Sequence, residues 1–249
     1  MPKIIVAVFL ILIFLILIFF IFDETVVEVE TIYILPLGDS ITQGGKINRE
    51  EYTYRFPLFC MLKDAVIDFD FIGSLKTGLH KEAKWPDYKG ESFDLDHEGH
   101  YGWKTGMVRN YLQEWMKAWA APPDIVLMHL GTNDQKSTDY NQSIVAPIKD
   151  MVKMLRRMNP KVVVLVGHLN FNSESVFDIR EQVEKMALEI TTPESPVITV
   201  HHYQDWNEEP KHIKTDTFDW VHPNPQGQHK MAEKWFKAML PFLNPISAK

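Results

Sequence analysis

The chain has 249 residues, of which 45% are hydrophobic and 24% are charged, a composition typical of folded globular proteins that excludes a disordered chain. Its formal net charge of −7, without any cluster of Lys or Arg, argues against nucleic acid as a partner. Cys60 is the single cysteine, so the sequence excludes an intramolecular disulfide.

The N-terminus contains a long apolar segment, IIVAVFLILIFLILIFFIF, over residues 4–22, without charge, glycine or proline. As a helix it would span about 28 Å, close to the hydrocarbon core of a bilayer. A cleaved signal peptide is the alternative, but its apolar region is only about 7–15 residues long and ends at a small-residue cleavage site. Asp23 and Glu24 follow instead. We therefore expect a transmembrane anchor over residues 1–24 and a short acidic stalk over residues 25–30.

The charges around this segment predict its orientation. Lys3 precedes the segment, and acidic residues follow it. By the positive-inside tendency, the N-terminus stays on the cytoplasmic or matrix-like side of the membrane. This predicts a single-pass protein whose remaining residues, 31–249, form one domain on the non-cytoplasmic (or non-matrix) side.

Five apolar runs in that domain are predicted as strands. The runs are continuous rather than alternating, which is typical of parallel strands covered on both faces. They comprise residues 31–37, 68–74, 124–131, 161–169 and 195–203.

Helical patterns lie between these runs and after the last of them, over residues 52–65, 104–120, 140–158, 174–190 and 225–240. Alternation of strands and helices predicts an α/β fold, with a five-stranded parallel sheet and helices on both sides. In such sheets the ligand site lies beyond the carboxyl ends of the strands.

Four polar motifs fall at this predicted edge of the sheet. Two of them directly follow a predicted strand, one leads into the helix over 104–120, and one precedes the last helix. They are Gly38-Asp39-Ser40, Gly99-His100-Tyr101-Gly102-Trp103, Gly131-Thr132-Asn133-Asp134 and Asp219-Trp220-Val221-His222-Pro223-Asn224.

The first and last motifs together contain the groups that acyl transfer by a serine requires. Ser40 is the candidate nucleophile, although a helix N-cap is the alternative role for a serine at a strand–helix junction. His222 is the candidate base, and Asp219, three residues earlier, is the candidate acid that orients the imidazole.

The two middle motifs contain candidate donors for an oxyanion. The backbone N–H groups of Ser40 and Gly102 and the side-chain amide of Asn133 are predicted to form the oxyanion hole. Gly102 suits this role because a residue without Cβ lets the backbone approach the reacting carbon. Asn133 as a simple turn residue is the alternative.

These blocks, in this order, resemble those of the SGNH (GDSL-type) hydrolases, named for their Ser, Gly, Asn and His. The segments RFPLFCMLKDAVIDFDFIGS, DHEGHYGW and DIVLMHLGTND are similar to the branch called carbohydrate esterase family three, which removes acetyl groups from xylan and related sugars. The resemblance covers residues 32–240. It implies a flavodoxin-like three-layer fold, a Ser40–His222–Asp219 triad, Gly102 and Asn133 in the oxyanion hole, and no metal or organic cofactor.

Four further residues are predicted to contact substrate. Tyr101 stands where a smaller residue is common in the resembling family and is expected to narrow the acyl pocket. Trp103 and Trp220 are candidates to stack on sugar rings, with packing as the alternative. Asp39 is expected to orient the loop at the substrate site rather than to react.

Two histidine-rich stretches are not predicted to bind metal or to react. His97-Glu98-Gly99-His100 lacks the spacing of the helical zinc-protease motif, and the chain has no cluster of thiolates, so we predict no metal site there. His201 and His202 follow a predicted strand and are interpreted as structural or as lining the rim.

The sequence therefore predicts a membrane-anchored serine esterase acting on small acyl esters, with O-acetyl groups on carbohydrate as the expected substrates. Two alternatives stay open. One is an accessory subunit that packs against other membrane protein subunits, with hydrolysis lost or incidental. The other is a lysophospholipase or thioesterase, for which a membrane stalk is convenient.

Overall fold

The computed structural model describes residues 30–45, 53–80 and 85–243. The predicted anchor over 1–24, and the stalk except for Glu30, lie outside the described residues. Within these three ranges, no helix has both the length and the apolar character needed to cross a membrane.

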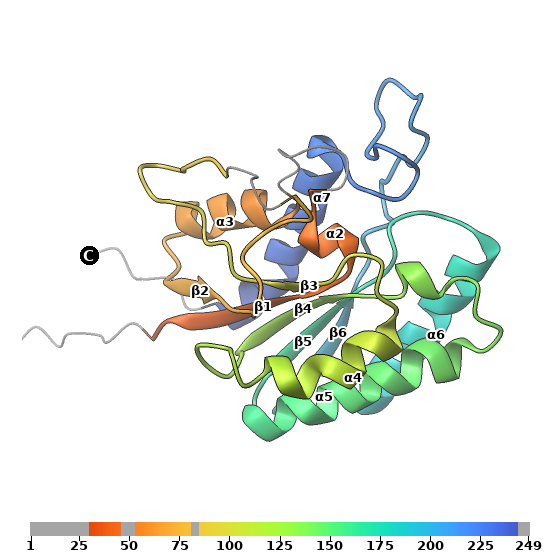
Figure 1. Ribbon diagram of the computed structural model, residues 1–249, viewed down its shortest axis with the longest axis horizontal. Coiled ribbons are helices and arrows are strands. Elements are labelled where there is room, and N and C mark those ends of the chain that lie inside the picture. The colour runs from red at the N-terminus through yellow and green to blue at the C-terminus, as the bar shows by residue number, and fades with distance from the viewer. Residues whose placement is uncertain (1–29, 46–52, 81–84, 244–249) are drawn as a thin grey trace, which may run out of the picture. The chain divides into compact units, whose positions relative to one another are not determined.

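A parallel sheet forms the centre of the domain, with strand order β2-β1-β4-β5-β6 (Figure 1). All five predicted strands are confirmed: β1 (Ile32–Gly38), β2 (Phe69–Phe71), β4 (Ile125–His129), β5 (Val163–Gly167) and β6 (Val197–Val200). The described part of the sheet has a sixth strand, β3 (Glu98–Gly99), which pairs with the end of β1. The prediction missed β3 because two residues make no hydrophobic run.

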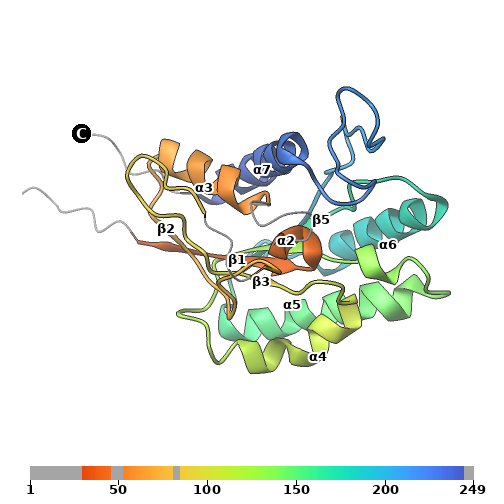
Figure 2. The same cartoon turned by 45° about the horizontal axis from the view of Figure 1, so that its top comes forward.

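Helices cover both faces of the sheet, as predicted (Figures 1 and 2). Helices α3 (Arg55–Asp64) and α7 (Pro225–Met239) lie on one face. Helices α4 (Thr105–Trp115), α5 (Ala146–Met158) and α6 (Glu174–Ile190) lie on the other. A π-helical segment, η2 (Asn141–Val145), precedes α5. A short helix, α2 (Ser40–Gln43), begins two residues beyond the end of β1.

Alternate residues of the strands point to separate cores on the two faces. Leu35 and Val126 belong to the cluster under α4, α5 and α6, whereas Ile34 and Leu127 pack with Trp235 of α7. Burial on both faces explains why the strands read as continuous apolar runs.

Close packing at the end of β1 directs the chain into the site. A Cβ at Gly38 would lie 2.3 Å from Thr42 Oγ1 and 2.7 Å from the carbonyl oxygen of His129. Glycine is therefore required where β1 turns into α2 beside the end of β4. The turn brings the residues after Gly38 to the carboxyl edge of the sheet.

Candidate active site

Ser40 is the first residue of α2, at the carboxyl end of β1. The helix is capped by Asp39, whose Oδ1 accepts the N–H of Ile41 at 3.0 Å. Asp39 therefore provides the cap that was the alternative role for Ser40. The Ser40 hydroxyl hydrogen-bonds a side chain from the far end of the chain instead.

That partner is His222, which lies 182 positions away. His222 Nε2 is 3.0 Å from Ser40 Oγ, and His222 Nδ1 is 2.9 Å from both carboxylate oxygens of Asp219. With the proton on Nδ1, the ring donates to Asp219 and accepts from the Ser40 hydroxyl, the tautomer that proton transfer from serine requires. The structure thus brings together the three side chains that the sequence singled out.

The loop carrying Asp219 and His222 is held by several hydrogen bonds. Asp219 Oδ1 also accepts the backbone N–H of His222 at 2.8 Å, so the acid fixes both the ring and the backbone of the base. From the neighbouring end of β5, Asn170 Nδ2 donates to the carbonyl oxygen of Val221 at 3.2 Å. Between acid and base, Trp220 adopts a left-handed φ of 72°. A non-glycine residue in this region is strained, and such strain is concentrated at functional sites.

The segments carrying the predicted oxyanion donors lie beside each other. Asn133 Nδ2 donates to the carbonyl oxygen of Trp103 at 2.9 Å, which ties the end of β4 to the segment containing Gly102. The N–H of Tyr101 donates to Gln43 Oε1 at 2.8 Å, which ties that segment to α2.

Gly102 has a backbone conformation that favours glycine. Its φ is +76°, which favours glycine, and a Cβ there would meet no protein atom within 4 Å. The backbone conformation is therefore one reason for glycine at this position. The predicted approach of this backbone to a reacting carbon stays a prediction.

A buried Glu–His pair supports this segment, and the sequence analysis missed its role. Glu98 is fully buried and accepts hydrogen bonds from Ser74 and from Trp119 Nε1, the latter at 2.8 Å. Its Oε1 lies 2.6 Å from His100 Nε2, and the His100 ring stacks on Trp115 at 3.8 Å between centroids. Glu98 and His100 therefore position the loop that leads to Gly102. The motif that contains Glu98 and His100 can be seen in the sequence, but the residues that bind Glu98, Ser74 and Trp119, come from distant positions.

The predicted substrate contacts differ in accessibility. Trp220 is 52% exposed beside the base, and the Tyr101 ring is parallel to the His222 ring, with 6.4 Å between centroids. Trp103 is partly buried and packs against Tyr111 and Trp115. Tyr101 and Trp220 therefore stay candidates for contact with substrate. For Trp103, the structure favours the alternative role in packing.

Asp39 is fully buried, so the expectation of a direct substrate contact is not supported. Burial raises the pKa of its carboxyl group to about 6, although the hydrogen bond from the Ile41 N–H lowers it. The pKa is also lowered by the nearby charge of His222. The position of Asp39 favours the orienting role that the sequence indicated, because it caps the helix that carries Ser40.

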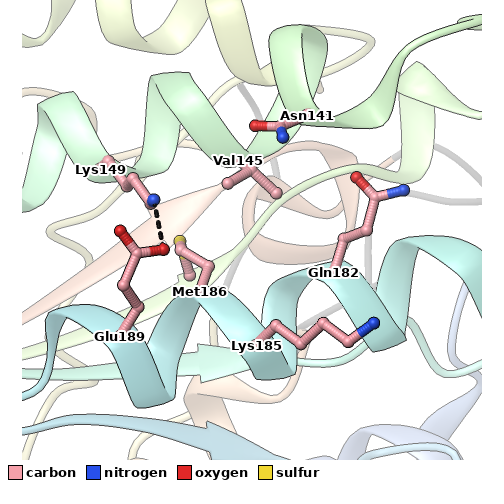
Figure 3. Close-up of a pocket in the computed structure, with 7 residues that line it drawn as sticks. All are labelled: Asn141, Val145, Lys149, Gln182, Lys185, Met186 and Glu189. Atoms are coloured by element: carbon pink, nitrogen blue, oxygen red, sulfur yellow. Dashed lines mark hydrogen bonds and ion pairs between the residues drawn. The ribbon is translucent and has the colours of Figure 1, made fainter.

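A shallow pocket lies elsewhere, between η2–α5 and α6 (Figure 3). It includes the ion pair between Lys149 Nζ and Glu189 Oε2, at 2.6 Å. Its lining shares no residue with the predicted site: Asn141, Val145, Lys149, Gln182, Lys185, Met186 and Glu189. This pocket therefore offers no alternative location for the reaction.

Residues 37–230 match the model of the GDSL-like lipase/acylhydrolase family. A multidomain esterase of Ruminococcus flavefaciens is 26% identical over 238 residues, covering 86% of this chain. The chain spans 29% of that relative's length.

Solved structures of esterases resemble the domain in fold and sequence. A carbohydrate esterase family 3 protein from Talaromyces cellulolyticus has 26% identity and a TM-score of 0.68, covering 85% of this chain and 98% of that one. A mutant acetyl esterase crystallised with an acetate ion has 25% identity and a TM-score of 0.69, with the same coverage. A family 3 carbohydrate esterase from Clostridium thermocellum, at 23% identity, has a TM-score of 0.63 and covers 86% of this chain and 97% of that one.

Proposed function

Because the chain belongs to the GDSL-like lipase/acylhydrolase family, we propose that it is a serine esterase that hydrolyses small acyl esters, with O-acetyl groups on carbohydrate as its substrates. The observation that carries this proposal is the hydrogen-bonded chain from Ser40 Oγ through His222 to Asp219.

In the proposed reaction, Ser40 Oγ attacks the ester carbonyl while His222 Nε2 accepts its proton. Asp219 stabilises the imidazolium that forms, and His222 then gives the proton to the departing alcohol. Water, activated by the same imidazole, hydrolyses the acyl-enzyme and releases the acid.

Charge develops on the carbonyl oxygen during both steps. The N–H groups of Ser40 and Gly102 and the amide of Asn133 are the proposed donors to it. The hydrogen bond from Asn133 to Trp103 O uses one amide proton, and the second is available to the oxyanion. Because these donors are held by packed segments, they need little reorganisation when the charge appears.

Acetylated carbohydrate is favoured as the substrate class by two observations. Similar structures include a family 3 carbohydrate esterase and an acetyl esterase, at 26% and 25% identity. In this chain, Trp220 offers a half-exposed indole beside His222, suited to stack on a sugar ring.

The test is hydrolysis of p-nitrophenyl acetate by the parent protein and by Ser40→Ala. We expect the variant to lose about 10⁴-fold or more in kcat/KM, because the other triad residues cannot act without the nucleophile. A fluorophosphonate probe should label the parent and not the variant. Equal hydrolysis by both proteins would overturn the proposal, and a folded parent that takes no label would favour the accessory-subunit alternative.

A substrate panel tests the acyl group and the alcohol. Acetylated xylo-oligosaccharides are expected to be hydrolysed in preference to lysophospholipids and long-chain thioesters. The opposite preference would favour the lysophospholipase or thioesterase alternative while leaving the serine mechanism intact.

We also propose that residues 4–22 anchor the enzyme in a membrane, on the strength of their uninterrupted apolar sequence. The full chain should stay in the membrane pellet after a carbonate wash, whereas a chain lacking residues 1–30 should not. Release of both by the wash would contradict the anchor.

A further inference from the structure

Three potential metal ligands meet at the β5–β6 end of the sheet, apart from the catalytic group. His168 directly follows β5, and His201 directly follows β6. Gly167 and Val200 are register partners, so the two histidines lie side by side. Glu184 comes from α6, which covers this face, and accepts a hydrogen bond from Thr199 at 2.7 Å.

The donor atoms of these side chains are spaced for a metal ion. Glu184 Oε2 lies 3.3 Å from Nε2 of His168 and 3.3 Å from Nε2 of His201. Zinc–ligand bonds of about 2.0–2.1 Å in a tetrahedron put neighbouring ligand atoms about 3.3–3.4 Å apart. All three donor atoms lie within 4.8 Å of one another. The His168 and His201 rings are stacked, with 4.9 Å between centroids, so a shared ion requires one ring to turn toward it.

An independent observation is the unsatisfied state of His168. The residue is only 5% exposed, yet among the described residues neither ring nitrogen has a hydrogen-bond partner. A buried polar side chain without partners is costly, and a bound ion or water molecule would remove that cost. Its Nε2 is the nitrogen that faces Glu184 Oε2.

Arg180 is the cation whose charge opposes a metal here. Its guanidinium hydrogen-bonds the carbonyl oxygens of Leu169 and Phe171 and lies 4.0 Å over the Tyr203 ring. The Glu184 carboxylate supplies the negative charge that offsets its repulsion of a metal ion.

We propose that His168, Glu184 and His201 bind one divalent transition-metal ion, with zinc as the ion this donor set fits best. Two imidazoles and a carboxylate are zinc ligands, and a water molecule would complete the tetrahedron. His201 and Glu184, whose side chains are 36% and 40% exposed, provide access from solvent. The site joins β5 and β6 to α6 and shares no residue with the catalytic group.

The test is zinc binding by the full chain after treatment with a chelator. Isothermal titration should give one zinc ion per chain. Cobalt(II) should produce the intense visible absorption of tetrahedral coordination. Glu184→Gln keeps the side-chain shape and His201→Ala removes an accessible ring, so both are expected to fold. Each should weaken zinc binding by roughly tenfold or more and abolish the cobalt spectrum.

His229→Ala is the matched control. His229 Nε2 also lies 3.3 Å from a carboxylate, Glu233 Oε1, but both side chains are 59% exposed and on one helix. This variant should bind zinc as the parent does and show the same rise in Tm when zinc is added. The proposal is overturned if the folded parent binds no zinc, if Glu184→Gln and His201→Ala bind it as tightly as the parent, or if His229→Ala loses it.

Discussion

Two histidines at the same edge of one sheet differ in how their ring nitrogens are engaged. His222, beside the end of β1, has Ser40 Oγ 3.0 Å from Nε2 and the Asp219 carboxylate 2.9 Å from Nδ1. His168, at the end of β5, is similarly buried, but neither of its nitrogens is hydrogen-bonded within the described chain. Glu184 Oε2 lies 3.3 Å from its Nε2.

The difference indicates what each region is built to do. A histidine with a donor on one side and a carboxylate on the other is prepared to move a proton. A buried imidazole whose nitrogens have no hydrogen-bond partner, with a carboxylate nearby, fits the metal site proposed above. Both residues are histidines at the same edge of the sheet, so the difference in their partners determines the difference in their chemistry.

The largest expected effect is the loss of hydrolysis in His222→Ala, and it should leave the proposed metal site unchanged. His222→Ala should lower kcat/KM for p-nitrophenyl acetate by about 10⁴-fold or more, because the proton of Ser40 then has no acceptor. The same variant should bind zinc with the affinity of the parent. Loss of zinc binding together with hydrolysis would mean that the two regions are one site.

Asn133→Ala tests the donors of the catalytic region. Removing an oxyanion donor costs about 2.7–4 kcal/mol, so kcat should fall about 10²- to 10³-fold while KM changes little. Urea unfolding of the same variant provides the control. If stability falls strongly and kcat does not, Asn133 serves mainly to hold the carbonyl of Trp103.

Asp39→Asn tests the buried carboxylate beneath the nucleophile. The pKa of Asp39 is about 6 in the folded protein, above its ordinary 3.8. The folded protein therefore holds this proton more tightly than the unfolded chain does. The stability that comes from this difference is complete below pH 3.8 and is lost as the pH rises through 6. Asparagine also caps helices, but it does not ionise. The variant should therefore be about 2–3 kcal/mol more stable than the parent at pH 7–8, as measured by urea unfolding.

The pH dependence distinguishes this explanation from a general change in packing. The advantage of Asp39→Asn should disappear when unfolding is measured below pH 4. A difference that stays constant from pH 4 to pH 8 would show that ionisation of Asp39 is not its cause.

The smallest expected effect concerns Trp220. Trp220→Ala keeps a non-glycine residue at φ 72° but removes the indole. It should raise KM for acetylated xylo-oligosaccharides by about 2- to 10-fold and leave hydrolysis of p-nitrophenyl acetate nearly unchanged. Trp220→Gly also relieves the backbone strain and should be more stable than Trp220→Ala. Equal KM values for parent and variants on the oligosaccharide would exclude stacking at this position.

Local sequence patterns were sufficient for most of the fold. The apolar runs predicted the five main strands because strands buried on both faces have no polar alternation, and the helical periods predicted the main helices between them. The Ser40, Asp219 and His222 motifs could be recognised because each falls at a turn next to a strand or helix end. Their approach to one another followed from the topology, since parallel strands end at one edge.

Other features depend on contacts that no local pattern records. The two-residue strand β3 exists because it pairs with β1, and Glu98 is a support because Ser74 and Trp119 donate to it. The complete burial of Asp39 likewise depends on tertiary packing and could not be predicted from the motif.

By itself, the sequence determined the layered α/β fold and the residues of the proposed triad, because periodicity and turn chemistry are local properties of the chain. Only the tertiary structure decided which histidines have partners and which do not. His168, Glu184 and His201 come from a strand end, a helix and another strand end. Their meeting depends on how α6 packs over β5 and β6, which is a property of the folded domain.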